Sequence, residues 1–75
     1  DNYEYIEEQI RKMVAIANKG VVFNLLSSYT PEKDQDDFFS YYKPEMVFSM
    51  CKRLVDNVVL RHDYLSNDCS FLMLK

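Results

Sequence analysis

Two short polar stretches hold the side chains best suited to chemistry in this sequence. Residues 27–29 (SSY) offer hydroxyl groups, and residues 61–68 contain the only histidine, His62. An imidazole titrates near neutral pH and could act as a general base, and the guanidinium of Arg61 could bind a carboxylate or phosphate. Structural roles are the alternative, because Asp63 could satisfy either side chain locally and serines commonly end strands.

The element that must position the first stretch is the nearly all-apolar run VVFNLLSSY, residues 21–29, directly after the only glycine. Its length and composition predict a strand over residues 21–28 that is buried on both faces, as in a doubly wound parallel sheet. A helix is predicted before it, over residues 3–19, because apolar residues recur there every three or four positions. Gly20 is expected to end that helix in a left-handed conformation.

The second half of the chain predicts a second helix and two more strands. Residues 44–55 begin with Pro44, which suits the first helical position. Residues 57–64 and 70–75 read as strands joined by a polar turn, hence an antiparallel hairpin. The predicted fold class is therefore α/β, or a small α+β fold in isolation: helix-strand-loop-helix-strand-strand with a three-stranded mixed sheet. A right-handed crossover would place Tyr29 and residues 61–68 at the same sheet edge.

Residues 30–43 form the longest irregular segment, acidic at first and then aromatic, with one or two helical turns possible within residues 34–40. Its four aromatic side chains have two interpretations, which the sequence leaves open. They could pack the loop onto the helices, or they could form a lid or substrate wall, since long loops in compact domains are often functional. The aromatic residues are Phe38, Phe39, Tyr41 and Tyr42.

Composition limits the partners and the compartment. The net charge is −3 and the basic residues are scattered, which argues against a nucleic-acid partner. No signal peptide or membrane-length apolar run is visible, so we expect a cytoplasmic protein without a membrane association. Cys51 and Cys69 fit no metal-ligand spacing, and no metal site is expected. A disulfide between them is conceivable, although a small secreted domain would normally have more cysteines.

Three segments resemble the C-terminal portion of bacterial class I, Rossmann-like S-adenosylmethionine (SAM)-dependent methyltransferases. They are GVVFNLLSSY at 20–29, YYKPEMVFSMCKRL at 41–54 and VVLRHDYLSNDCSFLMLK at 58–75. The resemblance covers essentially the whole chain but only about the last third of the family's length. It implies that the final strand is antiparallel and lies between its two predecessors. It also implies that residues 1–75 are a C-terminal fragment lacking the cofactor-binding half, because no Gly-rich turn is present.

The resemblance further implies that the edge of the sheet lies beside a methyl acceptor, a small molecule or glycan precursor. His62 would be the general base there, and no residue of the chain would bind the cofactor. The expected partners are the missing N-terminal half or a second copy of the chain, and the chain alone is predicted not to be catalytic. The alternative is a stand-alone α+β interaction module that dimerises through the exposed edge of an apolar strand. The implied substrate-binding residues are Asn24, Ser27, Tyr29, Arg61 and Tyr64.

Overall fold

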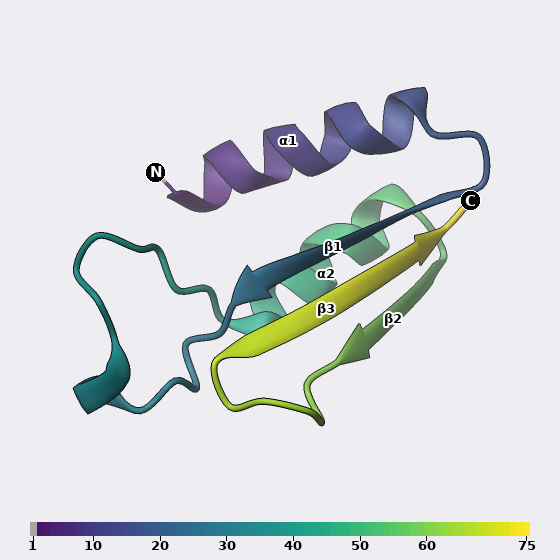
Figure 1. Ribbon diagram of the computed structural model, residues 1–75. Coiled ribbons are helices and arrows are strands. Elements are labelled where there is room, and N and C mark those ends of the chain that lie inside the picture. Colours follow the sequence, from purple (N-terminus) through teal and green to yellow (C-terminus); the bar gives the residue numbers. More distant parts are fainter. Residues whose placement is uncertain (1) are drawn as a thin grey trace.

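The computed structural model describes residues 2–75 and contains two helices on one side of a three-stranded sheet (Figure 1). This small α+β fold has the predicted element order. The elements are α1 (Asn2–Ile16), β1 (Gly20–Leu26), a short 3₁₀ helix η1 (Glu32–Asp34), α2 (Pro44–Leu54), β2 (Asn57–Arg61) and β3 (Asp68–Leu74).

The strand order is β1-β3-β2, so the last strand of the chain is the central one. It pairs antiparallel with both neighbours, which confirms the predicted placement of β3, and Phe71 sits opposite Phe23 on one side and Leu60 on the other. Because both outer strands are antiparallel to β3, β1 and β2 run in the same direction (Figure 1). Their carboxyl ends therefore lie at the same end of the sheet, as the crossover argument predicts.

The core lies between the helices and the inner face of the sheet. Phe71 of β3 is completely buried, and its ring stacks on that of Phe23 with the centroids 5.2 Å apart. Burying one such side chain stabilises the fold by about 1.5–3 kcal/mol. Both helices, the sheet and one residue of the long loop contribute side chains to the core. Its buried apolar members are Ile10, Val21, Tyr42, Val47, Met50, Cys51, Cys69, Phe71 and Met73.

The opposite face of the sheet is covered by no helix of residues 2–75. One row across it is apolar, Val22 of β1, Leu72 of β3 and Val59 of β2, and Val22 is 69% exposed. The prediction that β1 is buried on both faces is therefore wrong for the chain as described. The strand has the composition of an interior element, but only its inner face is covered here.

The outer edge of β1 is also largely unpaired within the described residues. Backbone hydrogen bonds just before and just after β1 show which of its residues bond to β3. The Lys19 carbonyl accepts from the Lys75 amide, and the Ser27 amide donates to the Asn67 carbonyl. Because backbone groups alternate in an antiparallel ladder, those of Gly20, Val22 and Asn24 point away from β3. Only the far end is covered, where Tyr42 exchanges hydrogen bonds with Leu26 and Ser28 at 2.9 and 2.8 Å.

Gly20 does not end α1, which corrects the sequence-based expectation. The helix stops at Ile16, and no glycine of the described chain has a positive φ. The ammonium group of Lys75 donates instead to the Val14 and Ala17 carbonyl oxygens, both at 2.8 Å, where a cation complements the helix dipole. Gly20 is the first residue of β1, and a Cβ built there would lie 2.4 Å from the Met73 carbonyl oxygen. The glycine is needed for close approach of two strands.

The remaining boundaries differ by a few residues from the prediction. β2 ends at Arg61 rather than at residue 64, because residues 62–67 form the connection to β3. β3 begins at Asp68, two residues earlier than predicted, since it is paired along its whole length with β1. The helical turn of the long loop is η1, slightly before the segment expected to contain it.

Candidate functional site

Three of the residues singled out in the sequence meet where β1 and β2 end. The Ser27 hydroxyl lies 2.6 Å from Nε2 of His62, and the Tyr29 amide donates to that hydroxyl at 3.1 Å. The ring of Tyr29 packs edge-on against the imidazole with the centroids 5.8 Å apart. Parallel strand directions bring these residues together although Ser27 and His62 are 35 positions apart.

Tyr29 extends this group to the beginning of α2. Its phenol donates a 2.8 Å hydrogen bond to the carboxylate of Glu45. That hydrogen bond raises the pKa of Tyr29 and lowers the pKa of Glu45, because it favours the protonated phenol and the ionised carboxylate together. Lys43, Met46 and Ser28 complete a cavity of about 510 Å³ beside this pair.

Asn24 and Tyr64 belong to a separate network on the open face of the sheet. The Tyr64 phenol donates to Asp68 at 2.6 Å and lies 2.5 Å from the Ser70 hydroxyl. The Ser70 hydroxyl donates to the side-chain amide oxygen Oδ1 of Asn24 at 3.1 Å. The hydrogen bond to Asp68 is the main cause of a raised pKa of Tyr64. These residues hold the start of β3 and its preceding loop onto β1.

Arg61 is engaged within its own loop. Its guanidinium donates to both carboxylate oxygens of Asp63, at 3.1 and 2.9 Å. The bidentate hydrogen bond raises the pKa of Arg61 and lowers that of Asp63. The side chains are 62% and 63% exposed, so the pair contributes little to stability. A ligand anion would have to compete with Asp63 for Arg61.

Exposure separates the residues that can meet a ligand from those that cannot. Ser27 is completely buried, whereas Tyr29 is 62% exposed and His62 is partly exposed. His62 also lines a shallow cavity of about 310 Å³ formed by residues 62–66. A molecule that binds at this end of the sheet could therefore contact His62 and Tyr29. Ser27 could influence it only through its hydrogen bonds to these two residues.

Both interpretations of the aromatic loop have support. Tyr42 is buried and packs edge-on against Tyr3 with the centroids 5.3 Å apart, and the Tyr41 hydroxyl accepts the Asp36 amide. Tyr42 therefore anchors the loop to α1, and the Tyr41 hydrogen bond holds two parts of the loop together. Phe38 and Phe39 are 95% and 58% exposed, so most of their aromatic surface faces solvent. These two remain candidates for a lid or substrate wall.

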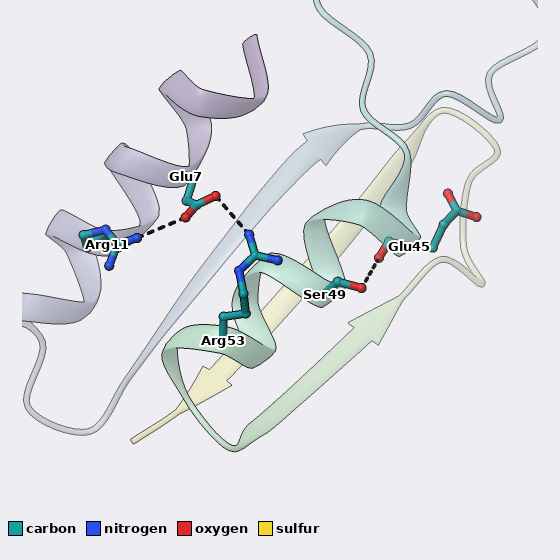
Figure 2. Close-up of polar contacts among 5 residues, drawn as sticks. All are labelled: Glu7, Arg11, Glu45, Ser49 and Arg53. Atoms are coloured by element: carbon teal, nitrogen blue, oxygen red, sulfur yellow. Dashed lines mark hydrogen bonds and ion pairs between the residues drawn. The ribbon is translucent and has the colours of Figure 1, made fainter. Parts of the chain in front are cut away.

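A second hollow lies between the helices and shares Glu45 and Met46 with the cavity beside Tyr29. A groove of about 480 Å³ runs between α1 and α2, where Glu7 is held by two arginines (Figure 2). Its carboxylate oxygens lie 3.0 Å from Arg11 and 3.0 Å from Arg53. The Ser49 hydroxyl donates to the Glu45 carbonyl one turn earlier in α2. The Glu7–Arg53 pair joins the helices and has a structural role.

The two cysteines are free thiols in the core. Burial raises the pKa of Cys51 and the pKa of Cys69 to about 11 each, so neither is a reactive nucleophile. No group of three or more potential metal ligands occurs within residues 2–75. No helix in that range is long and apolar enough to cross a membrane.

Sequence reasoning missed three residues of these networks: Glu45, Asp68 and Ser70. Glu45 follows a proline at a helix start, a position where an acidic residue already has an electrostatic explanation. Asp68 reads as part of a turn. Only the pairing of Asn24 with Ser70 across β1 and β3 shows that these polar residues face one another.

Comparison with known proteins gives one informative match. A protein of Mycobacterium tuberculosis (strain ATCC 25618 / H37Rv) that is named "Putative methyltransferase" is 32% identical to this chain over 72 residues. The match covers 95% of the chain but 43% of the relative, so the chain spans less than half the length of the protein it resembles. No protein-family model matches the sequence. No solved structure matches it either.

Proposed function

We propose that this chain is the substrate-side, sheet-completing portion of a SAM-dependent methyltransferase. The observation that carries the proposal is the match to a methyltransferase-named relative along 95% of the chain but 43% of that relative. The length left over is what a separate cofactor-binding half requires. Rossmann-like methyltransferases place that half next to the strands described here, which is the class I architecture that we propose for the intact protein.

The open face of the sheet and the outer edge of β1 support the proposal that the chain is part of a larger domain. Within residues 2–75, Val22 and Val59 are 69% and 43% exposed on a face that no helix covers, and backbone groups on the outer edge of β1 are unpaired. An exposed apolar strand edge is a surface that proteins normally cover. A further strand beside β1 and helices over the open face would cover both features.

The residues present do not form a SAM site. Such a site needs glycines whose backbone approaches the ligand closely, and the only glycine, Gly20, lies against the Met73 carbonyl oxygen instead. When bound, SAM supplies an electrophilic methyl group that must be held in line with the acceptor atom. The contribution proposed for this chain is on the acceptor side, where His62, Tyr29, Arg61 and the network of Asn24 and Tyr64 surround the end of the sheet. The acceptor would be a small molecule or a glycan precursor.

Calorimetric titration with SAM tests the proposal. The 75-residue chain alone should show no saturable heat, whereas a chimera that joins it to the unmatched part of the Mycobacterium relative should bind SAM. The unmatched part alone serves as the control and should bind more weakly than the chimera. Saturable binding by the 75-residue chain, or a chimera that folds without binding, would overturn the proposal.

A second function is favoured by the unpaired outer edge of β1: a stand-alone interaction module in which two copies pair through this strand. Light scattering after gel filtration should then show a dimer, and Val22→Lys should shift it to monomer by placing a charge in the interface. Ile16→Lys is the matched control, since Ile16 is also an exposed β-branched residue, 86% exposed, but lies at the end of α1. A strictly monomeric chain at high concentration would contradict this alternative.

A further inference from the structure

Ser27 is held in place by every polar group of its backbone. Its amide donates to the Asn67 carbonyl at 3.1 Å, and its carbonyl accepts both the amide and the hydroxyl of Thr30, at 3.0 and 2.6 Å. The residue is fully buried beside the end of β1. The backbone of Ser27 is therefore fixed by the fold.

The surroundings of the Ser27 hydroxyl decide where its proton points. The oxygen already accepts the Tyr29 amide, and the remaining contact in the described residues is Nε2 of His62 at 2.6 Å. A buried hydroxyl without an acceptor is unfavourable, so its hydrogen belongs on the hydrogen bond to Nε2. Nε2 must then be the unprotonated nitrogen of the neutral ring, and Nδ1 must carry the proton.

We propose that Ser27 is a positioning residue that fixes His62 as the Nδ1–H tautomer, so that His62 presents a hydrogen-bond donor to the substrate. Nδ1 has no hydrogen-bond partner among residues 2–75, and the His62 ring is partly exposed at this end of the sheet, so a ligand could reach it. The ligand chemistry that fits it is an oxygen atom that accepts a hydrogen bond, such as a carbonyl, carboxylate or phosphate oxygen. That the ligand is a methyl acceptor rests on the proposed function; the tautomer does not.

The Nδ1–H tautomer is not the one that His62 would need to act as a general base. A base facing the substrate through Nδ1 would need an unprotonated Nδ1 and a proton on Nε2. In that arrangement Ser27 would accept two hydrogen bonds and its own buried proton would have no acceptor. The geometry therefore favours binding and orientation of the acceptor by His62 over removal of its proton.

Nitrogen NMR tests the tautomer directly. His62 is the only histidine, so the long-range ¹H–¹⁵N spectrum of the untagged 75-residue chain contains one imidazole and needs no assignment by mutation. In the neutral ring, Nε2 should show the shift of an unprotonated nitrogen and Nδ1 that of a protonated one. The opposite pattern, or averaged shifts of a mixture, in the unmodified chain would overturn the proposal.

Substitutions of Ser27 test whether its hydroxyl, and not merely a folded chain, fixes the tautomer of His62. Ser27→Ala should lose the fixed tautomer and give averaged nitrogen shifts, while Ser27→Thr, which keeps the hydroxyl, should restore it. Ser28→Ala is the matched control and should leave the tautomer unchanged, because Ser28 is adjacent but, within residues 2–75, His62 is hydrogen-bonded to the hydroxyl of Ser27. A Ser27→Ala chain that folds and keeps the fixed tautomer would contradict the role of Ser27, whatever the result for the SAM titration.

Substitution of His62 tests the consequence for the reaction in the chimera. His62→Asn keeps an N–H donor near the position of Nδ1 but cannot act as a base. We expect the methyl-transfer rate to fall by less than about tenfold, whereas loss of a general base would cost about 10²–10⁴-fold. A loss in the larger range would show that His62 removes a proton, and it would leave the methyltransferase assignment standing.

Discussion

Gly20→Ala should destabilise the fold, because the glycine permits a close approach of β1 and β3. A Cβ at this position would lie 2.4 Å from the Met73 carbonyl oxygen, a backbone atom that cannot move without shifting a central strand. Overpacking of this kind costs about 1–3 kcal/mol. Alanine also lowers the entropy of the unfolded chain, which offsets about 0.4–1 kcal/mol. The expected net loss in the free energy of unfolding is up to about 2.6 kcal/mol, a large change for a domain of this size.

Urea unfolding followed by circular dichroism measures this loss. Asn57→Ala is the matched control, since Asn57 flanks Leu74 from the other outer strand as Gly20 does from β1, and is exposed. Gly20→Asn distinguishes two possible reasons for the glycine: the close approach of two strands and a left-handed conformation that ends a helix. Asparagine tolerates a left-handed conformation and would be nearly neutral at a helix stop, but it should cost at least as much as alanine here. A neutral Gly20→Asn, or a stabilising Gly20→Ala, would show that β1 and β3 do not need a glycine at this position.

Three further predictions test the core, the helix pair and the thiols. Phe71→Ala should lower the free energy of unfolding by about 3–5 kcal/mol, since Phe71 is fully buried at the centre of the sheet, and a loss below 1 kcal/mol by urea unfolding would show a loosely packed core. A double-mutant cycle of Glu7→Gln and Arg53→Gln should give a coupling of about 0.2–1 kcal/mol, because the pair is partly exposed; a coupling of several kcal/mol would contradict this. Both thiols should react slowly with a disulfide reagent at pH 8, because a pKa of about 11 rather than 9.0 leaves about 100-fold less thiolate, and unfolding in urea should remove the protection. Rapid modification of the folded chain would show that Cys51 and Cys69 are not buried.

The order of the elements was predictable because each has a strong local signal. Helical spacing, the proline at residue 44 and the apolar run after Gly20 all depend on neighbours in the sequence. The position of β3 between β1 and β2 came from the family resemblance, because pairing between strands leaves no local signal. The end of α1 was predicted incorrectly for a related reason: its carbonyls are capped by Lys75, which lies 61 residues from Val14.

The candidate site was predictable in part. Parallel directions for β1 and β2 were enough to bring Tyr29 near residues 61–68, and the 2.6 Å contact of Ser27 with His62 follows from that arrangement. The division into two networks was not predictable, because it depends on the register that places Asn24 opposite Ser70. The role of Glu45 depends on how α2 approaches the end of β1, and that angle is set by packing in the core.

The proposed function requires that β1 be an interior strand with a further strand beside its outer edge. Hydrogen exchange of individual amides measures whether that strand is present. In the 75-residue chain the amides of Val22 and Asn24 should exchange rapidly while those of Val21, Phe23 and Leu25 are protected, and in the SAM-binding chimera all five should be protected. If the amides of Val22 and Asn24 are equally unprotected in a folded chimera, no further strand pairs with β1, which would contradict the proposed function.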